Sequence, residues 1–98
     1  MTDNPIVTMA LDEYDVLTTE LGDLHRQLAM VRVAERNSYH SAYASSVAAG
    51  HNVTTCRELA DSASATYTNE AETINAELQA GLLRLRYLDQ HLAFIHVM

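Results

Sequence analysis

A single turn signal divides the interior of this chain and limits the fold to elements on either side of one reversal. In AAGHNVTTCRE, residues 48–58, Gly50 suits the left-handed conformation that follows the end of a helix. Asn52 suits the cap of a second helix, and Thr55 with Glu58 three residues later forms a capping box that offers a competing start. The chain is therefore expected to form a helix, a short turn and a second helix.

The composition favours helices throughout the rest of the chain. Only three glycines and one proline interrupt 98 residues, of which 48% are apolar. The first helix opens either at Pro5, which is tolerated in a first turn, or after Thr8, which precedes several acidic residues. We predict an all-α protein with one domain, residues 1–98, in which helices at about 8–49 and about 53–96 flank a turn at about 50–52.

Apolar residues recur every three or four positions in both segments, which is the spacing of one helix face. From Tyr67 to Leu85 the steps are closer to an eleven-residue repeat than to a heptad, and predict a nearly straight helix. Folding at the turn brings position i close to about position 101 − i, so the two faces meet in an antiparallel hairpin. The faces consist of Leu17, Leu21, Leu24, Leu28 and Val31 in the first segment and of Val53, Cys56, Ala60, Ala63, Tyr67, Ala71, Ile74, Leu78, Leu82, Leu85, Leu88, Leu92 and Ile95 in the second.

The carboxyl-terminal stretch GLLRLRYLDQHLAFIHVM, residues 81–98, carries more apolar side chains than one neighbouring helix covers. Four or five exposed leucines would forfeit on the order of 5–10 kcal/mol, so we expect two hairpins to pair into a four-helix bundle. The alternative is that PIVTMAL, residues 5–11, folds back over this end and completes a monomeric core. The predicted homodimer interface consists of Leu17, Leu21, Leu24, Leu28, Leu82, Leu85, Leu88 and Leu92.

The charge balance argues against two classes of main partner. A net charge of −7 and a pI near 4.9 argue against a nucleic-acid backbone or an anionic membrane as the main partner. The single cysteine, Cys56, makes no internal disulfide, and neither a secretory signal nor a membrane span is recognisable, so we expect a cytoplasmic protein. All six basic residues are arginine, a codon usage expected of a GC-rich genome such as that of an actinobacterium or its viruses.

The histidines and carboxylates show no catalytic, cofactor or metal signature. The five histidines include no pair at i, i+4, and His91 and His96 point about 140° apart on a helix. In the hairpin His40 should lie near Asp61, as a hydrogen-bonded surface pair. The sequence therefore predicts a non-enzymatic protein that holds no metal and no cofactor.

A basic and aromatic stripe lies on the first helix and is the predicted surface for a partner. Single-stranded nucleic acid uses such stripes by pairing phosphates with arginine and stacking bases on tyrosine. Interleaved acidic residues favour a protein partner instead, although Glu35 lies closer to the apolar face, where it could meet Tyr67 or an arginine. The stripe consists of Arg26, Arg32, Arg36, Tyr39 and Tyr43.

Residues 34–92 resemble a group of small helical proteins. The stretch AERNSYHSAYASSVAAGHNVTTCRELADSASATYTNEAETINAELQAGLLRLRYLDQHL combines an A…Y…A spacing, a glycine-containing turn, R-x-x-A-x-x-A and a closing R-x-R-x-L-x-x-x-L. It resembles the Ala-rich helical proteins encoded by bacteriophages of actinobacteria, some of them near recombination genes. The resemblance implies a phage accessory protein that acts in the host cytoplasm by binding, either to a host protein or, in DNA recombination, to single-stranded DNA.

A second resemblance is to the helical hairpins exported by type VII secretion, which share the length, the acidity and the central turn. Those proteins carry Trp-x-Gly in the turn, where this chain has Ala49, Gly50 and His51. They also carry a Tyr-x-x-x-Asp/Glu signal behind the second helix, whereas here His91 follows Tyr87 by four residues. Both departures argue against export.

Overall fold

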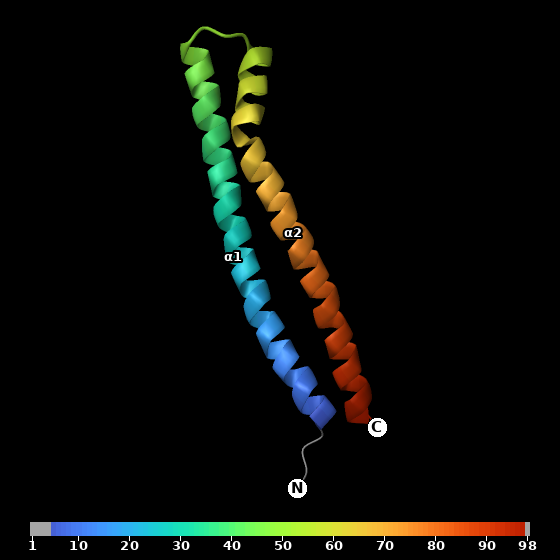
Figure 1. Ribbon diagram of the computed structural model, residues 1–98. Coiled ribbons are helices and arrows are strands. Elements are labelled where there is room, and N and C mark those ends of the chain that lie inside the picture. The colour runs from blue at the N-terminus through green and yellow to red at the C-terminus, as the bar shows by residue number, and fades with distance from the viewer. Residues whose placement is uncertain (1–4, 98) are drawn as a thin grey trace.

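Two long helices packed side by side make up the fold. In the computed structural model, which describes residues 5–97 and the side chains of residues 5–94, α1 spans Pro5–Ala48 and α2 spans Val53–Val97. The helices are antiparallel, so α1 begins where α2 ends, at what we call the open end, and the turn closes the other end (Figure 1). The hairpin is a rod of 75 × 17 × 14 Å. The predicted all-α hairpin is confirmed.

The turn and the helix ends follow the local signals. Gly50 has a φ of +86°, its N–H donates to the Val47 carbonyl at 3.0 Å, and the His51 N–H donates to the Ser46 carbonyl at 3.1 Å. These two bonds form a Schellman motif, which satisfies carbonyls at the end of α1. Asn52 caps α2, because its Oδ1 accepts the Thr55 N–H at 2.8 Å.

The starts of both helices settle the alternatives that the sequence left open. α1 begins at Pro5 rather than near residue 8, because proline suits the first helical position. α2 begins at Val53, so the competing start at Thr55 is not used. Residues 5–11 form the first turns of α1 and leave Ile6 60% and Met9 70% exposed. This segment therefore packs on the leucine-rich end as a continuation of α1, with Val7 and Ala10 turned toward α2, and covers only part of that end.

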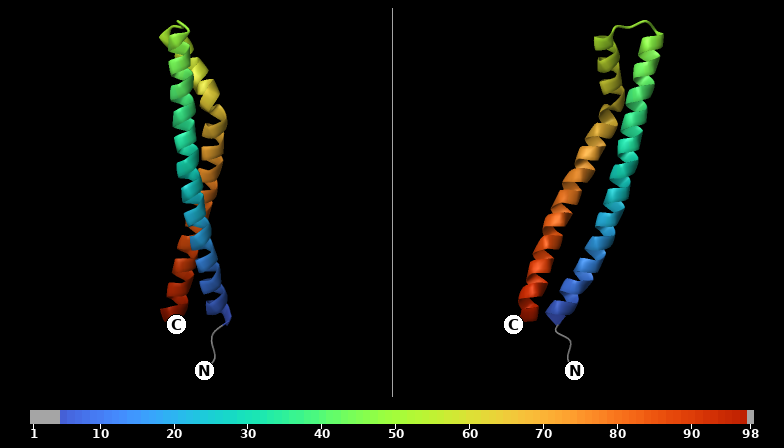
Figure 2. Two further views of the ribbon diagram at one scale, coloured as in Figure 1. Left: turned by 90° about the vertical axis from the view of Figure 1, so that its left-hand side faces the viewer. Right: turned by 180° about the vertical axis from the view of Figure 1, so that it is seen from behind.

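The contact between the helices, which we call the seam, follows a heptad rather than the predicted eleven-residue repeat. It passes through Ser64 and Gly81, whereas Val53, Ala63 and Leu82 are exposed. Steps of three and four residues alternate strictly in a heptad, and such a repeat gives a left-handed supercoil. In the left view of Figure 2, α1 crosses in front of α2 in that sense. The seam comprises Val7, Ala10, Tyr14, Leu17, Leu21, Leu24, Leu28, Val31, Glu35, Ser38, Ala42 and Ser46 of α1 and Cys56, Ala60, Ser64, Tyr67, Ala71, Ile74, Leu78, Gly81, Leu85, Leu88 and Leu92 of α2. The alternation breaks only next to the turn, where the step from Ala42 to Ser46 and the steps from Cys56 through Ala60 to Ser64 are all four residues.

Gly81 occupies a seam position at which an added side chain would displace Leu21. A Cβ atom at Gly81 would lie 2.5 Å from Leu21 Cδ2 and 3.7 Å from Leu17 Cδ1. The missing side chain thus makes room for two leucines of α1. Gly22, by contrast, has no atom within 4 Å of an added Cβ.

These two glycines give a paired prediction. Gly81→Leu should lower the free energy of unfolding by about 1–3 kcal/mol, because the new side chain overpacks the seam against Leu21. Gly22→Leu should raise it by about 0.5–1 kcal/mol, because it replaces a poor helix former in open space. Urea unfolding followed by circular dichroism measures both, and effects of the same sign would contradict this account of Gly81.

Candidate protein-binding surfaces

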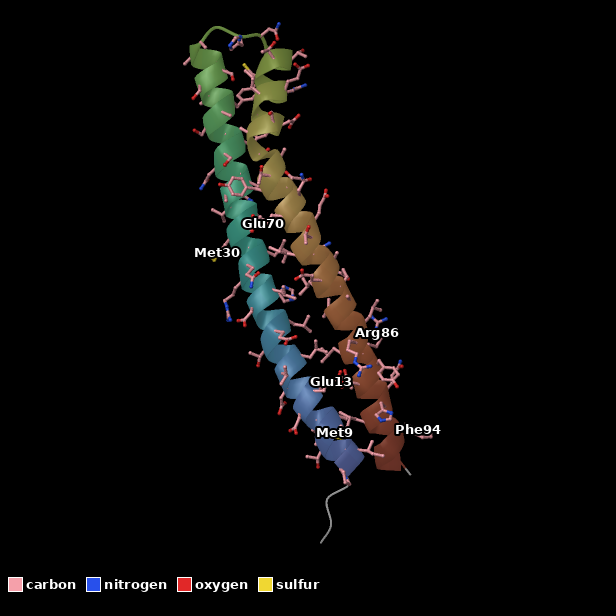
Figure 3. The ribbon with its side chains drawn as sticks, viewed as in Figure 1. Met9, Glu13, Met30, Glu70, Arg86 and Phe94 are labelled. Carbon is pink, nitrogen blue, oxygen red and sulfur yellow. The ribbon has the colours of Figure 1, made fainter. Side chains whose placement is uncertain are left out.

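An open groove lies between the helices at the open end. Three of its lining side chains are apolar or aromatic and well exposed, namely Ile6, Met9 and Tyr87. Phe94, which follows Tyr87 by seven residues, is 64% exposed near the same end, and Figure 3 shows it projecting from the edge of α2 that faces away from α1. The groove is lined by Ile6, Met9, Ala10 and Glu13 of α1 and by Arg84, Tyr87, Leu88 and His91 of α2. We call the side of the hairpin that carries it the groove side.

A chain of polar and aromatic contacts holds the wall of the groove in place. Arg84 Nε donates to Glu13 Oε1 at 2.7 Å and joins the two helices. The Arg84 guanidinium lies over the Tyr87 ring at 5.0 Å, and Tyr87 stacks on His91 at 6.0 Å between ring centroids. The hydrogen bond from Arg84 lowers the pKa of the Glu13 carboxyl below its usual value. These contacts connect Glu13 of α1 to Arg84, Tyr87 and His91 of α2 along the wall of the groove.

The predicted interface leucines pack mainly within one hairpin. Leu21 and Leu88 are only 5% and 2% exposed, which leaves little of them for a second copy. Leu82 lies outside the seam and is 38% exposed. The remaining members of the predicted interface are half-buried in the seam, namely Leu17, Leu24, Leu28, Leu85 and Leu92.

Sequence reasoning missed the apolar surface of the groove side. Met9 and Val16 are seven residues apart on α1, and Tyr87 and Phe94 are seven apart on α2. All four are more than half exposed. The sequence therefore contains a second apolar row at heptad spacing beside the seam. The prediction of the interface relied on the leucines, which are more numerous, and did not include this row.

The groove side continues toward the turn as an acidic hollow. Glu20 follows Glu13 by seven residues and Glu77 precedes Arg84 by seven, so both stay on the groove side. Asp23 lines the hollow as well and pairs with Arg26. Among the residues that the structure describes, neither Glu20 nor Glu77 pairs with a basic side chain.

The opposite side of the hairpin, which we call the stripe side, holds most of the predicted partner surface. Tyr39 stacks on Tyr43 with ring centroids 6.2 Å apart and meets His40 edge to face at 5.9 Å. Arg36 and Tyr39 line a polar hollow that Asp61 completes from α2. The hollow is lined by Glu35, Arg36, Tyr39, His40, Asp61, Ser64 and Thr68, so His40 and Asp61 share one hollow, as expected.

Two arginines of the predicted stripe are engaged with carboxylates. Arg32 Nη1 lies 3.4 Å from Glu35 Oε1, at the edge of the polar hollow. Arg26 pairs with Asp23 beside the acidic hollow and does not line the polar one. The structure thus brings Arg32, Arg36 and the two tyrosines together and leaves Arg26 apart.

Glu35 meets α2 through Thr68 rather than through Tyr67. The Thr68 hydroxyl donates to Glu35 Oε2 at 2.6 Å, across the seam. This hydrogen bond, followed by the charge of Arg32, lowers the pKa of the Glu35 carboxyl, although partial burial opposes the shift. Sequence reasoning placed Glu35 near the seam, but the identity of its partner depends on the seam register.

The Glu35 contact gives a pH-dependent prediction. Because the pKa of Glu35 is lower in the folded state, its stabilisation is present above the ordinary value of about 4.5 and is lost as the pH falls through the folded value. Thr68→Val should therefore destabilise the hairpin at pH 7 and cost less at pH 3, as measured by urea unfolding. Thr73→Val is the matched control, since the Thr73 hydroxyl bonds only the Asn69 carbonyl, and its effect should not change with pH.

The described part of the chain shows neither a metal-binding cluster nor a membrane-spanning helix. Among those residues no three His, Cys, Asp or Glu side chains lie close enough together to hold a metal ion. The side chain of His96 lies outside the described residues. Neither described helix is long and apolar enough to cross a membrane.

No protein-family model, curated protein or solved structure matches this chain.

Proposed function

We propose that this protein is a non-enzymatic binding protein that pairs with itself through the groove side and presents the stripe side to a protein partner. The observation that carries the proposal is the exposed groove at the open end, where Met9 and Tyr87 are 70% and 54% exposed. Contiguous apolar surface rimmed by polar groups is typical of protein interaction sites. Two hairpins joined on this side form a four-helix bundle.

The exposed area of the hairpin supports a dimer. One hairpin exposes 7146 Å², whereas a compact folded monomer of the same mass exposes about 5,600 Å². The difference, about 1,500 Å², is roughly twice the area that each partner contributes to an interface of standard size. A second copy therefore has enough surface to cover without disturbing the seam.

The stripe side supports contact with a different protein. Tyrosine and arginine are enriched at the centres of protein interfaces, and here Arg36 lies beside the stacked pair Tyr39 and Tyr43. The resemblance of residues 34–92 to phage-encoded accessory proteins supports a host protein as the partner and the host cytoplasm as the location. Affinity capture with the assembled protein as bait would identify that partner.

Solution mass tests the self-association. Light scattering after size exclusion should give twice the 10.9 kDa of one chain. A single-chain mass at every concentration tested would refute the homodimer.

A second candidate function is direct contact with single-stranded DNA, as in phage recombination. The stacked tyrosines beside Arg36 favour it, because bases stack on aromatic rings while arginine pairs with phosphate. A fluorescent oligothymidine should then bind at low salt, with affinity that falls as salt rises and falls further in Arg36→Glu. No binding at low salt would remove this function and leave the protein partner.

A further inference from the structure

We infer that the part of the hairpin next to the turn unfolds locally as a unit, while the rest of the two helices stays packed. The part that opens, which we call the turn segment, is residues 42–60. The remainder, which we call the leucine segment, holds the leucines of the seam. Such an opening takes place within one hairpin and requires neither self-association nor a partner.

The seam of the turn segment is built from small side chains. Its members are Ala42, Ser46, Cys56 and Ala60, of which the last three are 6%, 1% and 0% exposed. These side chains are well buried, yet each removes less apolar area from water than a leucine does. Tyr43 is half-buried beside them, but its ring stacks on Tyr39 of the same helix. Hydrophobic burial therefore holds the turn segment together more weakly than the leucine segment.

The polar contacts between the helices lie outside the turn segment. The hydrogen bond from Arg84 to Glu13 lies near the open end, and the one from Thr68 to Glu35 lies just beyond the turn segment. Within residues 42–60, all of which the structure describes, the side-chain hydrogen bonds stay within one helix or the turn. The contact of Thr68 with Glu35 consequently ties the helices together at the border of the segment that opens.

The packing pattern changes at this border. In the leucine segment the steps of the seam alternate between three and four residues, whereas in the turn segment and up to Ser64 every step is four. Extra steps of four residues locally unwind a coiled coil. The Ser64 hydroxyl also donates to the Ala60 carbonyl at 3.0 Å, a contact that often bends a helix. Figures 1 and 2 show α2 changing direction in this region, where its colour passes from yellow to orange.

Local helix preference adds little stability at the start of α2. The stretch HNVTTC, residues 51–56, consists of residues that form helices less readily than alanine or leucine. Proteins open first in cooperative units that have few buried apolar contacts. Weak burial, the lack of cross-helix polar contacts and this low preference all place the lowest local stability of the described hairpin in the turn segment.

Local unfolding would take apart the polar hollow on the stripe side. That hollow takes Tyr39 and His40 from α1 and Asp61 and Ser64 from α2, at the border of the turn segment. Its two walls separate when the adjoining parts of the helices lose contact. A ligand that contacts both walls therefore binds the closed state and stabilises the turn segment against opening.

Alkylation by iodoacetamide tests the inference, because a buried thiol reacts only when its surroundings open. Cys56 is the single cysteine and is 1% exposed, so the unsubstituted protein already reports on the turn segment. Two variants in a Cys56→Ala background, Ala60→Cys and Ala71→Cys, place a thiol on either side of the border. The two alanines are a matched pair, since both lie in the seam of α2 and both are 0% exposed.

The thiol at position 60 is expected to react about tenfold faster, or more, than the thiol at position 71 at low urea and one protein concentration. The rate for Cys56 should rise with urea, but less steeply than global unfolding followed by circular dichroism. The reason is that opening of the turn segment exposes only part of the surface that global unfolding exposes.

Equal rates at positions 60 and 71 would show that the hairpin opens as one unit and would overturn the inference. Fast reaction of Cys56 with slow reaction at position 60 would also overturn it, because only the first turn of α2 would then fray. If a cysteine variant does not fold, the unsubstituted protein decides. A rate for Cys56 that is independent of urea, or one that follows global unfolding, would exclude the turn segment as a separate unit.

Discussion

Leu78→Ala is expected to lower the free energy of unfolding by about 2–5 kcal/mol, which is the range for a buried leucine truncated in a packed core. Leu78 is 4% exposed and lies in the middle of the seam, between Ile74 and Gly81. The described hairpin has a single seam and no second core layer, so neighbouring side chains have little freedom to refill the space. A loss of this size is a large fraction of the stability of a small domain.

Leu83→Ala is the control for this prediction. Leu83 lies on the same helix but is 64% exposed, so its truncation should change stability by less than about 0.5 kcal/mol. Both variants should be unfolded in urea at one protein concentration, because self-association adds to the apparent stability. Equal costs for Leu78 and Leu83 would show that the helices do not pack along the seam described above.

Val16→Asp is expected to weaken self-association by about 100-fold or more, which corresponds to about 2.7 kcal/mol. Val16 is 58% exposed and follows Met9 by seven residues, so it lies on the groove side. In the proposed dimer an aspartate at this position is desolvated, and it lies close to the acidic hollow formed by Glu20 and Asp23. Light scattering across a dilution series measures the shift from dimer to monomer.

Val33→Asp provides a closely matched comparison. Val33 is the same residue type on the same helix and is 54% exposed, but it faces away from both the seam and the groove. Its substitution should leave the mass unchanged. If both variants dissociated the dimer equally, the interface would not be the groove side, and if neither did, the groove would not contribute to self-association. Unchanged helix content in both variants would exclude unfolding as the cause.

The two kinds of prediction separate stability from association. The seam holds one hairpin together. Its buried members, such as Leu21, Leu78 and Leu88, pack within that contact and are not available to a second copy. The groove side is built from residues that the seam leaves exposed, such as Met9 and Tyr87. Substitutions on the groove side should therefore alter mass with little effect on helix content, and substitutions in the seam should alter both.

Local sequence signals were sufficient for the helices and the turn. Gly50 adopts a positive φ and Asn52 caps α2, as the motif AAGHNVTTCRE predicted, because both effects depend on backbone and side chains within a few residues. The start of α1 at Pro5 was one of the two candidates that the sequence offered.

The path of the seam depended on tertiary contacts. Steps of three and four residues allow the face of α2 to pass through either Leu82 or Gly81, and apolarity favours Leu82 in the sequence. The structure uses Gly81, because Leu21 and Leu17 fill the space above a residue that has no side chain. The same register brings Thr68 to Glu35 and leaves Leu82 exposed.

The sequence by itself therefore determined two helices, their antiparallel order and the residues of the turn, since these follow from short-range hydrogen bonding and from the apolar period. The apolar period also predicted most of the seam, including Leu21, Leu78 and Leu88. Only the tertiary structure decided that the seam passes through Gly81 instead of Leu82 and which exposed residues form the groove at the open end. The physical reason is that burial depends on how the two helices rotate about their own axes. That rotation is set by the close fit of particular pairs such as Leu21 and Gly81, which lie far apart in the chain.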